Sequence, residues 1–236
     1  MAPKQFRMVF AIYSGMTQLD FTGPHQFLSQ LPDCELLVAS TKGGTVSADG
    51  LHFGSTSRLA DITHCDLLFV PGGHAATQVA LDDNFLDEII RLGRTSKYIT
   101  SVCTGSLILG AAGFLVGKRA ACHWASRKFL PEFGAIPDSA RVVRDGNVIT
   151  GGGVTAGIDF ALTVISELAG DKVAQAVQLG MEYLPSPPFT AGSPETAPPE
   201  VVSMFTCAVN KLAESRSRDV LQAANKARNN QGSAPI

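Results

Sequence analysis

The sequence predicts an α/β fold, namely a three-layer α/β/α sandwich around a mostly parallel sheet. One sign is that short, mostly apolar runs, such as 6–13 and 65–70, alternate with stretches of helical pattern. Strands that are apolar on both faces are typical of parallel sheets covered by helices on either side. A second sign is the segment 98–113, where a β-branched run ends at Cys103 and a helical run begins at once. This is the pattern of a nucleophile elbow, a sharp strand-to-helix turn.

The first half of the chain is expected to begin with a strand at 6–13. Thr22-Gly23-Pro24 then opens a short helix that ends near residue 31, because proline suits the first turn of a helix. Asp49-Gly50 is a hairpin signal. The later elements are expected in this order: a strand at 34–40, a hairpin across 45–53, a strand at 65–70, a helix at 84–95 and a strand at 98–102.

The second half is expected to add helices and one hairpin, whose Asp145-Gly146 pair marks the turn. Its elements are helices at 104–112 and 123–130, two strands within 141–150, helices at 155–168 and 171–183, and a final helix at 200–228. The proline-rich segment 184–199 is expected to be an ordered arm on the core or on a partner subunit. Residues 229–236 should fray. One domain spanning 1–236, with its core at about 5–183, is therefore predicted.

The composition excludes several classes of protein. Among 236 residues the net charge is −2, which gives no reason to expect a nucleic-acid partner. Only 17% of the residues are charged, which favours extensive burial and a subunit interface. We find neither a signal peptide nor an apolar run long enough to cross a membrane. The five cysteines are odd in number and form no CxxC pair, so we expect free thiols, no structural zinc and a cytoplasmic protein.

Cys103 is the leading candidate for a functional residue. It stands at the predicted elbow, where the partial positive charge of a helix N-terminus should favour the thiolate. Asp20, the loop 71–73 and the loop 151–153 should reach the same edge of the sheet, because ligands bind at the carboxyl ends of parallel strands. The residues alone leave Asp20 open between a carboxyl group held against the thiol and an acid in a helical first turn or solvated loop.

Two histidines and two glycine loops are further candidates. The Gly72-Gly73 pair offers backbone N–H groups for an oxyanion site, and His74 is a potential base or a surface residue. His123 is either a second potential base or a structural histidine. The glycine run 151–153 lacks the features of a nucleotide loop and instead suggests close backbone approach. Thr104, not histidine, follows Cys103, so any base must come from His74, His123 or a carboxylate.

Several segments together resemble the isocyanide hydratases of the ThiJ/PfpI superfamily, which has the flavodoxin-like, class I glutamine amidotransferase-like fold. The superfamily motifs are Val70-Pro71-Gly72-Gly73, Ser101-Val102-Cys103-Thr104-Gly105, Gly117-Lys118-Arg119 with His123-Trp124, and the run 151–159. The narrower resemblance lies in the segments 18–25, 142–147 and 187–198, of which the last is the most discriminating. It covers about residues 6–199.

This resemblance implies a hydro-lyase that needs no metal or organic cofactor and that forms a homodimer. Cys103 would attack the terminal carbon of a small-molecule isocyanide, R–N≡C, Asp20 would serve as general acid and base, and Thr104 would position substrate or water. A thioimidate on sulfur would then be hydrolysed to an N-substituted formamide. His74 and Val154 depart from the usual hydratase pattern, with His74 replacing a smaller polar residue and Val154 a larger aliphatic one. Both should shape the pocket.

Two other functions are compatible with parts of the same pattern. The Cys103 and His123-Trp124 segments also resemble the ligand-sensing half of AraC-type regulators. Only about 37 residues follow Pro199, with no basic recognition helix, which disfavours DNA binding. A glyoxalase, deglycase or peptidase of the same superfamily is the other alternative. It is disfavoured by Thr104 beside the cysteine and by Asp20 in place of a longer glutamate.

Overall fold

The computed structural model describes residues 6–210 and 213–232 and confirms the predicted α/β sandwich. Its main sheet has the strand order β3-β4-β2-β1-β5-β6-β10-β9. Strands β4, β2, β1, β5, β6 and β10 are parallel to their neighbours in that order, whereas β3 and β9 add antiparallel edges. The strands are β1 (Phe6–Ala11), β2 (Cys34–Ser40), β3 (Gly44–Ala48), β4 (Leu51–Arg58), β5 (Leu67–Val70), β6 (Tyr98–Val102), β9 (Val142–Asp145) and β10 (Val148–Gly151).

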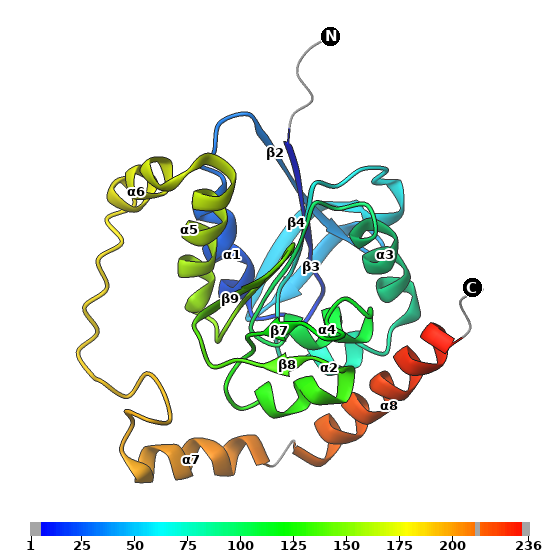
Figure 1. Cartoon of the computed structure of the whole chain (residues 1–236), viewed down its shortest axis with the longest axis vertical. Coiled ribbons are helices and arrows are strands. Elements are labelled where there is room, and N and C mark those ends of the chain that lie inside the picture. Colours follow the sequence, from blue (N-terminus) through cyan, green and yellow to red (C-terminus); the bar gives the residue numbers. More distant parts are fainter. Residues whose placement is uncertain (1–5, 211–212, 233–236) are drawn as a thin grey trace.

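Helices cover both faces of the sheet (Figure 1). One layer holds α1 (Gln18–Leu28), α5 (Ala156–Ala169) and α6 (Asp171–Gly180). The other holds α2 (Ala76–Val79), α3 (Asp83–Gly93), α4 (Gly105–Ala111) and α8 (Ala213–Gly232). Smaller elements complete the fold: two 3₁₀ helices, η1 (Leu59–Asp61) and η2 (Arg127–Phe133), and the paired short strands β7 (Arg119–Ala120) and β8 (Ile136–Pro137). None of the described helices is long and apolar enough to cross a membrane.

The parallel order follows from the apolar strands, whose side chains are buried on both faces. Every side chain of β5 is buried, as are the last four of β1. Phe69 on β5 packs against Phe10 of β1 and Phe160 of α5, with ring centroids 5.2 and 5.6 Å apart. The core therefore lies on both sides of the central strands and holds their carboxyl ends rigidly.

Several element boundaries differ from the sequence-based expectation. Helix α1 begins at Gln18, not near Thr22, which brings Asp20 into its first turn. Asp49 and Gly50 form the predicted hairpin turn, with φ angles of 48° and 80°. The helix expected at 123–130 is instead the 3₁₀ helix η2. Helix α2 was not foreseen at all, because its four residues are too few to show a period.

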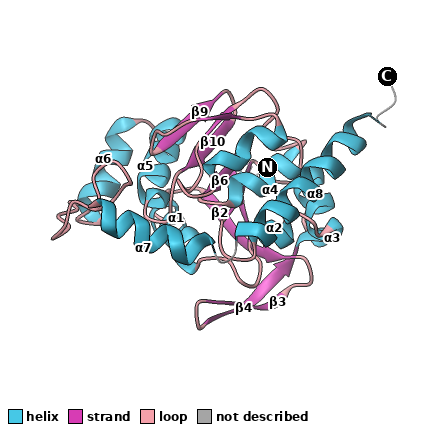
Figure 2. Ribbon diagram, turned by 90° about the horizontal axis from the view of Figure 1, so that it is seen from below, coloured by secondary structure: helices cyan, strands magenta, loops and turns pink. Residues whose placement is uncertain are grey.

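The C-terminal part of the chain differs most from the sequence-based expectation. The single helix expected at 200–228 is wrong, because the structure has two helices, α7 (Pro199–Asn210) and α8. Fraying at 229–232 is also wrong, since α8 extends to Gly232, while 233–236 lie outside the described residues. The segment 184–198 is mostly exposed and loops away from the sheet before α7 (Figures 1 and 2). Its residues 192–195 nevertheless line a cavity together with Trp124 and Gly153 of the core. Packing on a partner subunit stays a prediction.

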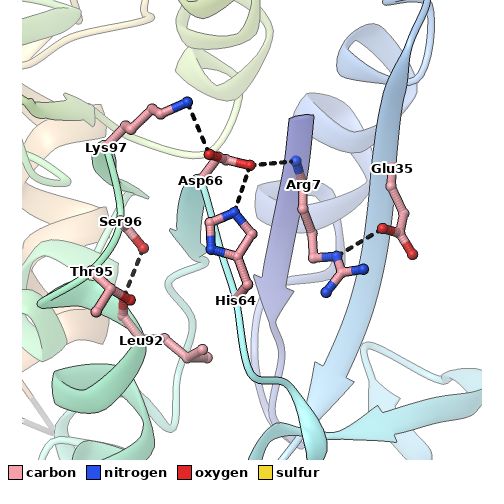
Figure 3. Close-up of polar contacts among 8 residues, drawn as sticks. All are labelled: Arg7, Glu35, His64, Asp66, Leu92, Thr95, Ser96 and Lys97. Carbon is pink, nitrogen blue, oxygen red and sulfur yellow. Dashed lines mark hydrogen bonds and ion pairs between the residues drawn. The ribbon is translucent and has the colours of Figure 1, made fainter. Parts of the chain in front are cut away.

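The amino-terminal edge of the sheet carries a buried, fully satisfied carboxylate (Figure 3). Asp66 is 4% exposed and accepts the backbone N–H of Arg7 at 3.0 Å. Its oxygens also contact Lys97 Nζ and His64 Nε2, each at 3.1 Å. Burial alone would raise the pKa of Asp66, but these three partners together hold it below its usual value.

The core packing leads to a stability prediction. Phe160→Ala should lower the free energy of unfolding by about 3–5 kcal/mol, because it removes a wholly buried ring and leaves a cavity against Phe69. Urea titration followed by circular dichroism measures this. Leu51→Ala is the control: Leu51 is 50% exposed at a hairpin end, so its loss should cost less than about 1 kcal/mol. Equal costs for the two would contradict the described core.

Candidate active site

Strand register brings the candidate residues to one edge of the sheet. Val70 of β5 lies opposite Ser101 of β6, and Val102 of β6 lies opposite Gly151 of β10. The strands therefore end level with one another, and Cys103 projects between the loops that follow β5 and β10. Asp20 reaches the same point from the first turn of α1.

Cys103 occupies the predicted nucleophile elbow. Its φ is +59°, a left-handed conformation that costs a non-glycine residue energy and that the fold must enforce. The enforcing contacts are two hydrogen bonds from its backbone N–H, to Gly151 O at 3.1 Å and Gly152 O at 2.7 Å. Helix α4 can start immediately afterwards because Gly105 has no side chain: a β-carbon there would lie 2.3 Å from Val70 O.

Asp20 is a buried carboxyl group that faces the cysteine. Its side chain is fully inaccessible, and neither oxygen has a hydrogen-bond partner of full geometry among the described residues. The Cys103 thiol and the backbone N–H of Gly72 lie close enough to favour the ionised carboxylate somewhat, but burial dominates and raises the pKa of Asp20 to about 7. Asp20 thus lies both in the first turn of α1 and against the thiol, so of the alternatives left open by the sequence the structure excludes only the solvated loop.

The state of the thiol differs from the sequence-based expectation. The helix N-terminus was expected to favour the thiolate, but Cys103 is only 5% exposed. Burial, then the charge of Asp20, raises the pKa of Cys103 well above its usual value. The expectation of a resting thiolate is therefore wrong. Removing the proton from sulfur therefore requires a nearby acceptor, and the Asp20 carboxyl group faces the thiol.

The loop after β5 is held against this pair. The backbone N–H of Gly73 donates to Thr104 Oγ1 at 2.9 Å, and the Thr104 hydroxyl lies 3.2 Å from Gly73 O. Tyr13, which sequence reasoning missed, donates its hydroxyl to Pro71 O at 2.9 Å. A β-carbon on Gly72 would lie 2.4 Å from Thr104 N and 2.8 Å from Asp20 Oδ2. Glycine is therefore required for the carboxyl and the elbow to meet.

These contacts leave no free oxyanion donor at Gly73. Its N–H is already bonded to the Thr104 hydroxyl, and the N–H of Gly72 faces Asp20. The expected role of the Gly72-Gly73 pair as an oxyanion site stays a prediction, and it requires these N–H groups to leave their present partners. Gly73 forms part of the pocket wall, as does Thr104.

A cavity of about 280 Å³ opens above Cys103. Four predicted residues line it beside Cys103 and Gly73, namely His74, Thr104, His123 and Val154. Its other lining residues are Thr17, Ala76, Thr77, Ala125, Ser126, Phe205, Val209 and Arg216. Phe205, Val209 and Arg216 come from α7 and α8, and sequence reasoning missed all three. No local pattern marks them, because only the return of the C-terminal helices brings them to this edge.

The two histidines differ in environment. His74 is exposed at the pocket, whereas His123 is partly buried beside Trp124. Burial, followed by the charges of Arg216 and Arg127, lowers the pKa of His123, so its imidazole is neutral at pH 7. Among the described residues no group of three or more His, Cys, Asp or Glu side chains is placed to hold a metal ion.

Known proteins resemble this chain over most of its length. Residues 6–167 match the model of the DJ-1/PfpI family. Isonitrile hydratase of Pseudomonas putida is 50% identical over 194 residues, which are 82% of this chain and 85% of that protein. The HTH-type transcriptional regulator CdhR of Pseudomonas aeruginosa is 32% identical over 62% of this chain, but over only 44% of its own length.

A solved structure extends the likeness to nearly the whole chain. The crystal structure of a ThiJ/PfpI family protein from Pseudomonas syringae superposes with a TM-score of 0.86 and 40% identity. The superposition covers 93% of this chain and 90% of that one. The C-terminal segments beyond residue 167 therefore have counterparts in that structure.

The two buried aspartates lead to opposite predictions for the pH dependence of stability. A carboxyl group whose pKa rises on folding stabilises the folded state fully below its unfolded pKa of about 4, and this contribution is lost as the pH rises through about 7. The difference in unfolding free energy between Asp20→Asn and wild type should therefore shift by about 4 kcal/mol in favour of the variant as the pH rises from 4 to 8. Urea titrations at several pH values measure the difference.

Asp66→Asn is the matched control. Its unfolding free energy relative to wild type should change with pH in the opposite direction. The pKa of Asp66 is lowered, so its stabilising contribution is present above pH 4 and lost as the pH falls through the folded pKa. Asp66→Asn should consequently cost most stability near pH 7 and less at pH 3. Parallel pH dependence of the two variants would contradict the contrast between the satisfied and the unsatisfied carboxyl group.

Proposed function

The chain belongs to the DJ-1/PfpI family, and we propose that within it this protein is a hydro-lyase that adds water to an isocyanide, R–N≡C, to give an N-substituted formamide. The observation that supports this best is the buried Asp20 carboxyl group against Cys103 at the base of a small pocket. The likeness to isonitrile hydratase of Pseudomonas putida supports the same reaction.

The first step adds the thiol across the terminal carbon. Asp20 accepts the proton of Cys103 as sulfur bonds to the isocyanide carbon, which is electrophilic toward a thiolate. The lone pair left on that carbon then takes the proton from Asp20, and a thioimidate, S–CH=N–R, results. A pKa of about 7 suits both transfers, because the carboxyl group can gain and lose a proton near neutral pH.

The second step hydrolyses the thioimidate. Asp20, again a carboxylate, accepts a proton from water as the water oxygen attacks the carbon, and it delivers this proton to nitrogen. The tetrahedral adduct collapses as its hydroxyl proton passes through Asp20 to sulfur and the C–S bond breaks. The product is HC(=O)–NH–R, and the thiol is restored, so the sum is one water added per isocyanide.

Other pocket residues position the substrate. Thr104 holds the loop through its two contacts with Gly73 and lines the pocket beside the sulfur. Val154 and His123 form walls around the reacting carbon, and His74 lies at the pocket's exposed side. No step needs a metal ion or an organic cofactor, because a carboxyl group and a thiol carry every proton and bond.

We also propose that the protein is a single-domain, cytoplasmic homodimer. Large apolar side chains stay exposed on α6 and in the segment before α7: Leu179 is 83% exposed, Leu184 85% and Phe189 78%. Exposing large apolar side chains to water is unfavourable, and a symmetric interface between two copies would cover them. All five cysteines are free, as in a reducing compartment. Sedimentation of the purified protein measures its oligomeric state.

An assay with an alkyl isocyanide tests the proposed reaction. Wild type should form the corresponding formamide, seen by NMR, and Cys103→Ala should lower kcat by at least about 10³-fold. Asp20→Asn should lower it by about 10²- to 10⁴-fold and abolish a pH-dependent limb near 7. Cys34→Ser and Asp66→Asn are the matched controls, because neither residue lines the pocket.

Four outcomes would contradict the proposed reaction or its residues. Absence of formamide with wild type, or undiminished turnover by Cys103→Ala, would exclude the reaction or its nucleophile. Full activity of Asp20→Asn would transfer the proton-carrying role to His74 or His123. Consumption of methylglyoxal in place of isocyanide would favour the glyoxalase alternative.

A further inference from the structure

The inward face of α8 ends in a charged residue at the pocket. Val220, Ala223 and Ala224 are each only 1% exposed and form the stripe by which α8 packs on the core. Arg216 lies one turn before Val220, so the i, i+4 spacing places it on the same face of the helix. It is half-buried and lines the cavity above Cys103, whereas Arg218, on another face, is exposed.

Two sets of contacts fix this end of the pocket. Asp219 on α8 accepts hydrogen bonds from the Thr77 hydroxyl at 3.1 Å and from the Gln78 amide at 3.2 Å, which ties α8 to α2. Phe205 on α7 packs against Trp124 with ring centroids 5.3 Å apart. Arg216 is therefore carried by a helix, α8, that is anchored on α2, and α7 is held beside Trp124.

Arg216 is the one permanently charged residue in the described lining of this cavity. No carboxylate lines the cavity, since Asp20 is fully inaccessible. Within the described residues no ion pair joins Arg216 to an acid, and the Asp219 carboxylate is occupied by α2. His123, which lines the same cavity, is neutral, and the charge of Arg216 helps to keep it so by lowering its pKa. The part of the pocket that Arg216 lines is thus electropositive.

We propose that Arg216 binds a carboxylate on the R group, so that the preferred substrates are isocyano carboxylates; this rests on the proposed hydration reaction. A guanidinium pairs with a carboxylate through two parallel N–H···O bonds, and a half-buried site strengthens them. The isocyano carbon must reach Cys103, so the carboxylate stands at the opposite end of the molecule. Val209 and Phe205 provide apolar walls for the methylene groups between the two ends.

Matched pairs of substrates test this assignment. A series of ω-isocyanoalkanoates of increasing chain length is compared with the corresponding methyl esters, which keep the isocyano group and lose the charge. For the best chain length, wild type should show a kcat/KM at least about 10-fold higher for the carboxylate than for its ester, as one charge-assisted contact provides. Added salt should reduce this ratio.

Substitution of Arg216 then tests whether the preference for the carboxylate depends on this residue. Arg216→Gln should bring the carboxylate-to-ester ratio close to 1, and Arg216→Lys should leave an intermediate ratio because it keeps the charge without the planar fork. Arg218→Gln, which removes the same charge from an exposed face of α8, should retain the wild-type ratio. Thermal unfolding of each variant confirms that α8 still packs.

The outcomes separate this inference from the function it rests on. Equal kcat/KM for carboxylate and ester across the whole series in wild type would overturn the carboxylate site while leaving isocyanide hydration intact. A preference that persists in Arg216→Gln would also overturn it. Failure of wild type to hydrate either the carboxylates or the neutral esters would overturn both.

Discussion

The meeting of Asp20 and Cys103 at the carboxyl edge of the sheet is the constraint on which the other features of the site depend. A carboxyl group without full hydrogen bonds in a buried site is costly, and the protein tolerates it because rigid elements hold it there. The level ends of β5, β6 and β10 fix the elbow, the first turn of α1 brings in the acid, and Gly72 leaves room for both. A pKa near 7 is the chemical result.

The opposite edge of the sheet shows what the same side chain does when it is satisfied. Asp66 is nearly as buried as Asp20, yet the Arg7 N–H, Lys97 and His64 surround it with donors and keep it ionised (Figure 3). It therefore stabilises the fold at neutral pH. Asp20 lacks such partners, so its burial favours the proton and destabilises the fold as the pH rises. The contrast between the two carboxyl groups separates the structural role of Asp66 from the catalytic role that we propose for Asp20.

Sequence reasoning reached the elbow and the acid because both depend on local signals. A β-branched run that ends at Cys103 and an acid just after the first strand are visible in the chain itself. The expectation that Cys103 is a thiolate was wrong. It used the position of the cysteine at a helix N-terminus, which the local sequence shows, whereas the burial that raises the pKa of the thiol depends on the whole fold. Arg216 and Phe205 could not be found, since they reach the pocket only through helices that follow an exposed segment. The expected continuous helix at 200–228 concealed the break that places them there.

The protonation of Asp20 can be measured directly by infrared spectroscopy of protein with isotope-labelled aspartate. The carbonyl band of a protonated carboxylic acid is distinct from that of a carboxylate, and Asp20→Asn identifies which signal belongs to this residue. The account predicts that the band assigned to Asp20 disappears with a midpoint near pH 7. A midpoint near the ordinary value of about 4 would contradict it, because Asp20 would then be too weak a base to take the proton from sulfur.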